Sequence, residues 1–147
     1  MARNFAATLG YDIADLQPGM VAEIGRTVSE ADILAFAGVS GDTNPVHLDA
    51  EFAAQTQFKE RIAHGMLSAA FISAVLGTKL PGPGAIYLSQ SLRFRAPVHV
   101  GDTVVARVTV KEVVPEKRRV VLETLCLVGE TVVVEGEATI YIPPRQG

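Results

Sequence analysis

The sequence has little of several residue types, and each shortage excludes a class of protein. A single cysteine, Cys126, excludes an internal disulfide and any thiolate-rich zinc site. Lys and Arg number 13 against 16 Asp and Glu, a net charge of −3, so no basic face for nucleic acid is expected. No apolar run reaches the roughly 18 residues that would span a membrane, and no apolar stretch near the start resembles a secretory signal. These shortages predict a cytoplasmic protein that binds neither nucleic acid nor membrane.

Hydrophobic residues, in contrast, are plentiful. They make up 48% of a chain of 147 residues, which is enough for one well-filled domain over residues 1–147, with its core at about 20–142. A chain this apolar without a membrane segment often covers part of its surface in a subunit interface. We therefore expect an oligomer.

The first part of the chain predicts a strand, a helix and a loop. The strand is expected over residues 20–28. Ser29 followed by Asp32 is typical of a helix N-terminus, and that helix is expected to run to about Ala37. Residues 38–45 contain Gly, Asn and Pro, which predicts a loop.

Two further helices are expected before the spacing of the apolar residues changes to that of strands. A short one starts at Asp49, with Phe52 and Ala53 facing inward. The second, from Met66 to about Lys79, is apolar on nearly every side, which predicts a buried helix. The run Pro81-Gly82-Pro83-Gly84 follows and excludes its continuation.

After this helix the apolar residues alternate with period two, as in half-buried strands. Four stretches do so: residues 86–94, 104–111, 119–128 and 131–142. Short turns at 115–118 and 129–130 predict that they form an antiparallel meander. The expected fold class is α+β, with a long buried helix wrapped by a curved antiparallel sheet.

One loop combines a carboxylate with an imidazole. Asp42 and His47 are separated by Asn44-Pro45, and because proline disfavours helix in the residue before it, they do not share a helix face. A turn that brings them together could hold one water between an acceptor and a group that exchanges protons near neutral pH. Two other interpretations stay open. In one, Asp42 caps the turn and His47 is an ordinary loop histidine; in the other, Asp42, His47 and His64 bind a metal, although they lack a short ligand spacing.

This loop resembles the hydratase-2 motif of MaoC-like (R)-specific enoyl-CoA hydratases. The matching residues are Phe36, Gly41, Asp42, Asn44, Pro45, Val46, His47 and Ala53. A second signature of that family, His-Gly-Met at the start of a buried helix, is matched by His64-Gly65-Met66. A later pattern is similar to Tyr87–Phe94, Pro97-Val98 and Gly101-Asp102, so the resemblance runs from about Val21 to Ile140. It implies the hot dog fold.

The resemblance also implies roles for residues. Asp42 and His47 would be the catalytic dyad, and the backbone N–H of Gly65 would bind the thioester oxygen, a position that the helix dipole favours. Ser73 would orient His47, although a helix serine also bonds its own backbone. Asn44, Met66 and Leu76 would contact substrate, with Leu76 limiting chain length because it lies three residues after Ser73. His64 is expected to be structural, His99 a surface residue and Cys126 part of the core.

The reaction that the resemblance implies is reversible, stereospecific hydration of trans-2-enoyl-CoA to (R)-3-hydroxyacyl-CoA by a homodimer. No redox cofactor and no metal is expected, and acyl-CoA is the substrate. Its phosphates could meet basic residues: Lys59, Arg61, Arg93 or Arg95. The alternatives are a dehydratase of carrier-protein thioesters, a hot dog thioesterase and a non-catalytic acyl-binding subunit. The pathway, whether fatty-acid degradation or polyester monomer supply, stays open.

Overall fold

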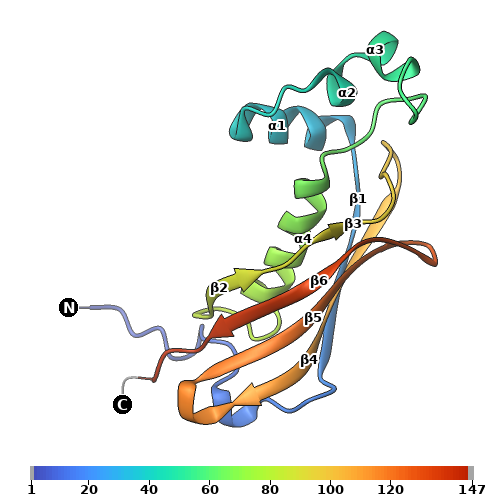
Figure 1. Cartoon of the computed structure of the whole chain (residues 1–147). Helices are drawn as coiled ribbons and strands as arrows, with labels where there is room; N and C mark the ends of the chain where they lie inside the picture. The colour runs from blue at the N-terminus through green and yellow to red at the C-terminus, as the bar shows by residue number, and fades with distance from the viewer. Residues whose placement is uncertain (1, 146–147) are drawn as a thin grey trace.

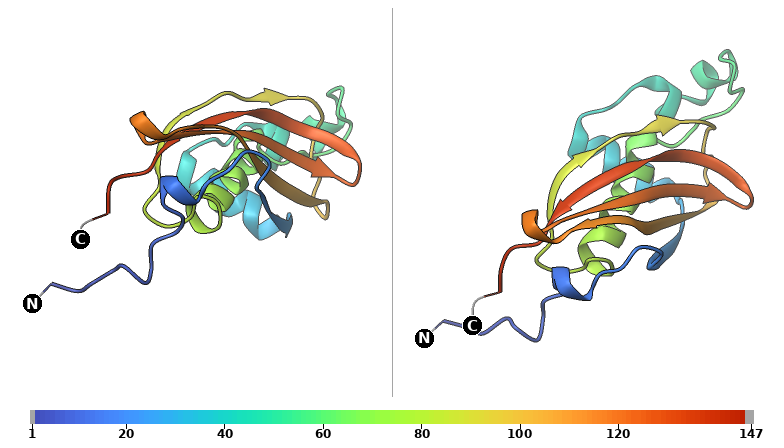
Figure 2. Two further views of the ribbon diagram at one scale, coloured as in Figure 1. Left: turned by 90° about the horizontal axis from the view of Figure 1, so that it is seen from below. Right: turned by 60° about the horizontal axis from the view of Figure 1, so that its bottom comes forward.

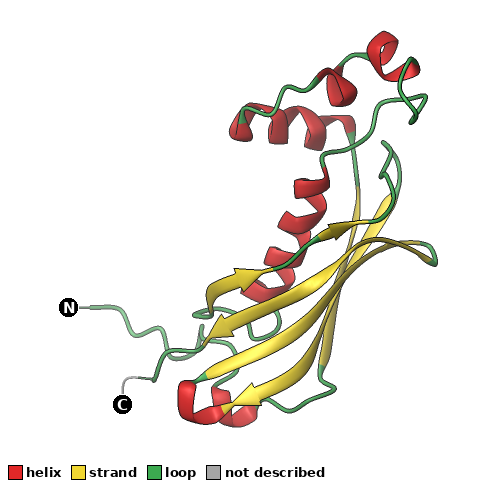
Figure 3. Ribbon diagram, in the orientation of Figure 1, coloured by secondary structure: helices red, strands yellow, loops and turns green. Residues whose placement is uncertain are grey.

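A computed structural model of the chain describes residues 2–145, and it has the α+β architecture expected from the sequence. Helix α4 (Gly65–Thr78) packs on one face of a six-stranded sheet, and three shorter helices lie at the end of the molecule where α4 begins (Figures 1 and 3). The strands are β1 (Val21–Thr27), β2 (Ile86–Gln90), β3 (Arg93–Phe94), β4 (Thr103–Val114), β5 (Arg119–Val128) and β6 (Thr131–Tyr141). A single 3-10 turn, η1 (Ile13–Asp15), precedes β1, and a second, η2 (Pro115–Lys117), joins β4 to β5.

The sheet is antiparallel and has the order β1-β4-β5-β6-β2, with β3 also on β6. Strands β4, β5 and β6 form the expected meander. The prediction that the stretch 86–94 precedes them in one continuous meander is wrong. Because β1 occupies the outer edge of β4, β2 and β3 pair instead with the free edge of β6, and residues 95–102 cross over the end of the sheet.

Helix α4 buries one face and exposes another. The buried side chains, Leu67, Phe71, Ile72, Val75 and Leu76, join the core with residues of β4, β5 and β6. Ala70, Ser73 and Gly77 are exposed, as is Met66 with 54% of its surface, and their spacing of three or four residues places them on one stripe. The expected burial on every side is therefore wrong for the single chain, since the sheet covers only one side. The core also extends before residue 20, because Ile13 and Leu16 are buried in it.

The short helices are α1 (Glu30–Ser40), α2 (Pro45–Leu48) and α3 (Ala50–Ala54). Ser29 and Asp32 form the expected capping box, at 3.1 and 2.9 Å. Helix α1 runs three residues past its predicted end, to Ser40, and the positive φ of 79° at the next residue, Gly41, stops it. His47 lies in a helical turn rather than the predicted loop, because the Asn44 side chain caps α2. Ala53 faces inward as expected, whereas Phe52 is 47% exposed.

Both ends of the described chain lie at the end of the sheet opposite α1–α3 (Figures 1 and 2). Arg145 donates to the Gly10 carbonyl, and Arg118 pairs with Asp12, so the first and last segments are attached to each other and to the sheet. Among the described residues, no helix is long and apolar enough to cross a membrane.

The break between β2 and β3 depends on Gly136 of β6. The Ser91 carbonyl oxygen lies 1.8 Å from the position that a Cβ on Gly136 would take. Gln90 stabilises the backbone at this break, because its Nε2 donates to the Ser91 carbonyl at 2.8 Å and to the buried Thr124 hydroxyl at 2.9 Å. Only glycine allows the two backbones to approach this closely.

We predict that Gly136→Ala displaces the β2–β3 segment from β6 and lowers the free energy of unfolding by about 1–3 kcal/mol, the usual cost of overpacking. Urea denaturation followed by circular dichroism measures it. Gly25→Ala is the control, because nothing lies within 4 Å of a Cβ at this position in β1. Equal stability of the two variants would contradict the prediction.

Candidate active site

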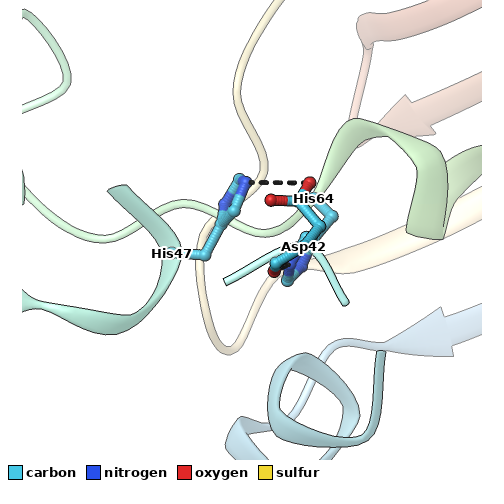
Figure 4. Close-up of side chains that lie close together, drawn as sticks. All are labelled: Asp42, His47 and His64. Atoms are coloured by element: carbon cyan, nitrogen blue, oxygen red, sulfur yellow. Dashed lines mark hydrogen bonds and ion pairs between the residues drawn. The ribbon is translucent and has the colours of Figure 1, made fainter. Parts of the chain in front are cut away.

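Asp42 is held by the turn between α1 and α2. Its N–H donates to Ser40 Oγ at 3.1 Å, and the Asn44 N–H donates to Asp42 Oδ1 at 3.2 Å. The other carboxylate oxygen, Oδ2, lies 4.0 Å from His47 Nε2 (Figure 4). One oxygen therefore caps the turn while the other faces the imidazole. Asp42 thus fits both the interpretation as a turn cap and the interpretation as one half of a pair that holds a water.

The His47 ring is oriented by a backbone carbonyl. Its Nδ1 and the Ile62 oxygen are 2.7 Å apart, and because a carbonyl only accepts, Nδ1 carries the proton. In the neutral ring Nε2 then carries the lone pair, directed toward Asp42 (Figure 4). The side chain is 9% exposed and that of Asp42 50%, so a buried imidazole faces a carboxylate at the rim of the site.

Arg61 attaches the segment that carries His47 to helix α1. Its Nε donates to the His47 carbonyl at 2.6 Å, and its two terminal nitrogens donate to the Glu30 carboxylate at 3.0 and 2.7 Å. The hydrogen bond from Arg61 holds the pKa of Glu30 below its usual range. Three of the five N–H groups are engaged in this way, so Arg61 positions α1 and α2 rather than standing free for a substrate phosphate.

A third ring connects these parts. His64, the N-cap of α4, is buried, and its Nε2 donates to the Asp42 carbonyl at 2.9 Å. Its ring stacks on that of His47 with 3.8 Å between centroids and 26° between planes. The ring of Phe36 of α1 also contacts it, with 4.8 Å between centroids.

A pocket of about 450 Å³ opens beside the dyad, and Asp42, His47 and the start of α4 line it. Most of the remaining wall is apolar: Phe58, Ile62, Met66, Phe94, Ala96, Pro97, Val98 and Val134. Gly65 and Met66 are the first residues of α4, whose N–H groups have no partner within the helix. The Phe94 ring lies over Gly65, within 2.6 Å of where a Cβ would be.

The structure brings some of the other predicted residues to this pocket and not others. Met66 lines it, and Asn44 lies in the adjacent turn, where its Oδ1 accepts from Val46 at 3.1 Å. Ser73 is exposed eight residues after Gly65, about 12 Å along the helix axis, and the Ile62 carbonyl rather than Ser73 bonds His47. Leu76 is 2% exposed in the core, outside the residues that line the pocket.

Asp42, His47 and His64 offer ligand atoms within 4.8 Å of one another. An imidazole binds a metal in the plane of its ring, along the nitrogen lone pair. The planes of two stacked rings hardly converge, so the lone pairs of the two histidines are not directed at one common point. The arrangement suits a water molecule and proton exchange better than a metal ion.

Sequence reasoning missed three features of the site. The Ile62 carbonyl orients His47, and because every residue has a backbone carbonyl, the residue type at position 62 does not indicate this contact. The Arg61–Glu30 pair joins residues 31 positions apart, and Phe94 reaches Gly65 from another strand, so neither has a local pattern. None of the three had a signal in the sequence, in contrast to His64, which was expected to be structural at the start of the helix. Cys126 and His99 match their predictions more closely: burial raises the pKa of the Cys126 thiol to about 12, and His99 is a partly exposed residue near Glu60 and Asp102.

The sequence and the fold were compared with those of known proteins. The family model of the MaoC like domain matches residues 15–134. An (R)-specific enoyl-CoA hydratase from Rhodospirillum rubrum is 60% identical over 131 residues, 89% of this chain and 91% of the relative. A 3-hydroxybutyryl-CoA dehydratase from Methylorubrum extorquens is 50% identical, over 90% of this chain and 84% of the relative.

The solved structure of the unliganded R-hydratase PhaJ1 from Pseudomonas aeruginosa superposes with a TM-score of 0.87 at 50% identity. The superposition covers 94% of this chain and 89% of PhaJ1. The helix packed on an antiparallel sheet is therefore the hot dog fold, as the sequence resemblance implied. This chain belongs to the MaoC-like domain family.

Proposed function

We propose that this protein is an (R)-specific enoyl-CoA hydratase, which adds water reversibly and with syn geometry to trans-2-enoyl-CoA to give (R)-3-hydroxyacyl-CoA. The names and high identity of its relatives support this reaction. The observation that carries the proposal is the gap of 4.0 Å between Asp42 Oδ2 and His47 Nε2, beside the free N–H groups of α4.

Two acceptors 4.0 Å apart are too distant for a direct hydrogen bond but suit one bridging water. In this proposal the carboxylate and the Nε2 lone pair accept the two protons of that water, and a lone pair of its oxygen faces the substrate. As the oxygen adds to C3, one water proton passes to the dyad. The dyad delivers one proton to C2 on the same face, so it ends in the protonation state in which it began.

Charge accumulates on the thioester oxygen while the C3–O bond forms. The first N–H of α4, at Gly65, together with the positive end of the helix dipole, would stabilise this enolate-like oxygen. The reaction changes no overall oxidation state and needs no redox cofactor. We assign the apolar wall of the pocket, Met66 included, to the acyl chain. Arg95, which lines the pocket and pairs with Glu135, and Arg93 of β3 are assigned to the phosphates of CoA.

We further propose a cytoplasmic homodimer. The exposed stripe on α4 and the exposed apolar side chains of the β2 edge (Ile86, Tyr87 and Leu88) are the surface that a second copy would cover. In this assembly Ser73 and Leu76, in the second half of α4, would border the acyl site. The (R)-3-hydroxyacyl-CoA product suits either fatty-acid metabolism or polyhydroxyalkanoate synthesis.

The dyad is tested by Asp42→Asn and His47→Gln. Each is expected to lower kcat for hydration of crotonyl-CoA by about 10²–10⁴-fold, the usual contribution of a positioned acid or base. Loss of the enoyl thioester absorbance measures the rate. Full activity in both variants would remove the dyad from the mechanism.

His99→Gln is the matched control, because His99 lies outside the pocket and is expected to be dispensable. Chiral chromatography of the hydrolysed product should give the (R) acid alone. An (S) product would contradict the stereochemistry, and release of free thiol without hydration would indicate a thioesterase.

Gly65→Ala places a methyl group where the Phe94 ring lies, so we expect the ring to turn and disturb the binding of the thioester beside the helix start. A displacement of about 1 Å at the reacting group costs up to about 10²-fold in rate, and kcat/KM for crotonyl-CoA should fall accordingly. Gly38→Ala, in α1 with nothing within 4 Å, should keep wild-type activity. Unchanged kinetics in Gly65→Ala would show that the Phe94 contact is irrelevant.

Leu76→Ala is expected to shift the preference toward longer enoyl chains by opening space behind the pocket. The measurement is kcat/KM for enoyl-CoAs of four to eight carbons. Truncation of a core leucine also costs about 2–5 kcal/mol of stability. Ile72→Ala, another buried residue of α4, therefore serves as a control that loses stability without a change in chain-length profile. An unchanged profile in Leu76→Ala would contradict its role.

A further inference from the structure

His64 contacts both members of the dyad, but its contacts leave Asp42 Oδ2 and His47 Nε2, the two atoms that face each other, free. It touches Asp42 through a backbone hydrogen bond and His47 through the face of its ring. From this geometry we infer that His64 is a positioning residue that holds Asp42 and His47 at the distance one water requires. The inference rests on the proposed function, which gives that distance its meaning.

The contact with Asp42 leaves its carboxylate free. His64 Nε2 donates at 2.9 Å to the Asp42 carbonyl, in the main chain of the turn. Asp42 Oδ1 accepts from the Asn44 N–H, and the Asp42 N–H donates to Ser40 Oγ, so both the backbone and the side chain of Asp42 are fixed. Only Oδ2 is left to face His47, at 4.0 Å.

The contact with His47 restricts the remaining rotation of the His47 ring. The hydrogen bond from Nδ1 to the Ile62 carbonyl fixes the position of one ring atom but still allows the ring to swing about the N–H···O direction. A ring stacked at 3.8 Å and nearly parallel blocks that swing on one side. Together the two contacts determine where Nε2 points.

The His64 side chain does not cap helix α4, although His64 occupies the N-cap position. An N-cap residue normally accepts a hydrogen bond from the first turn of its helix, and Ser, Thr, Asp and Asn do this best. His64 makes no such bond, and among residues 2–145 its Nδ1 is the buried side-chain polar atom without a partner. An unpaired buried atom in a native protein calls for a reason, and contact with the dyad supplies one.

His64 also joins the dyad to the helix start. It directly precedes Gly65, so the residue that fixes Asp42 and His47 is covalently bonded to the proposed donor for the thioester oxygen. The Phe36 ring of α1 also packs against His64, at a tilt of 55°. The three rings therefore tie α1, α2 and α4 together at the point where the water and the substrate would meet.

Two variants separate the two contacts. His64→Gln keeps an amide N–H near the place of Nε2 and removes the ring, whereas His64→Phe keeps the ring and removes the donor. In each we expect kcat for crotonyl-CoA to fall at least tenfold, with KM changed less than threefold and the circular dichroism spectrum unchanged. His99→Gln, a histidine outside the pocket, should match wild type in both constants.

Double-mutant cycles distinguish positioning from a general structural role. His64→Gln should cause no further loss once His47→Gln is present, and His64→Phe none once Asp42→Asn is present. Equal losses in every background, or a single variant with more than half of the wild-type kcat, would overturn the inference.

Nuclear magnetic resonance gives a readout independent of activity. The stacked ring should shift the His47 Hε1 resonance upfield in wild type and in His64→Phe but not in His64→Gln. The absence of that pattern would contradict the positioning role. Absence of hydration by wild type, with the pattern present, would instead contradict the proposed function.

Discussion

The packing of α4 on the sheet is the constraint on which the rest of the molecule depends. Its buried face supplies the helical half of the core, so the first turn of the helix has one possible place. Residues 41–64, which precede the helix, are positioned relative to this first turn. The Ala63 N–H donates to the Val98 carbonyl at 2.7 Å, and the Ile62 N–H donates to the Val46 carbonyl at 3.3 Å. The position of every group in the site therefore follows from where the helix begins.

The site is assembled mainly through the main chain. Backbone groups of Asn44, Ile62 and Asp42 hold the side chains of Asp42, His47 and His64, in that order. Backbone partners are rigid because the turns that carry them are rigid, and they do not compete with the substrate for side-chain atoms. This explains how a carboxylate that is half exposed can stand at a defined distance from a buried imidazole. It also explains why the motif consists largely of turn-forming residues.

Local features were predictable from the sequence, and long-range ones were not. The capping box of α1, the hairpin at Gly129 and the extent of β5 follow from residues close in the chain. The loop residues linked Asp42 to His47, and the family resemblance added their role as a catalytic dyad. The placement of β2 beside β6 could not be predicted, because it depends on which strand edge remains free after the others have paired. The apolar composition of α4 likewise concealed its exposed side, because Met66, Ala70 and Gly77 on that side are of the same apolar types as residues of the core.

The first and last described segments lie at the same end of the sheet, opposite α1–α3, and Arg145 donates to the Gly10 carbonyl there (Figures 1 and 2). The pocket, beside α2 and the start of α4, is therefore remote from both ends of the described chain. A protein with this layout can be immobilised on a solid support, or fused to a second enzyme, through either end without an obstacle placed before its substrate. Direct transfer of an acyl thioester between fused catalysts is then governed by the length of the linker around the sheet, not by reorganisation of the site itself.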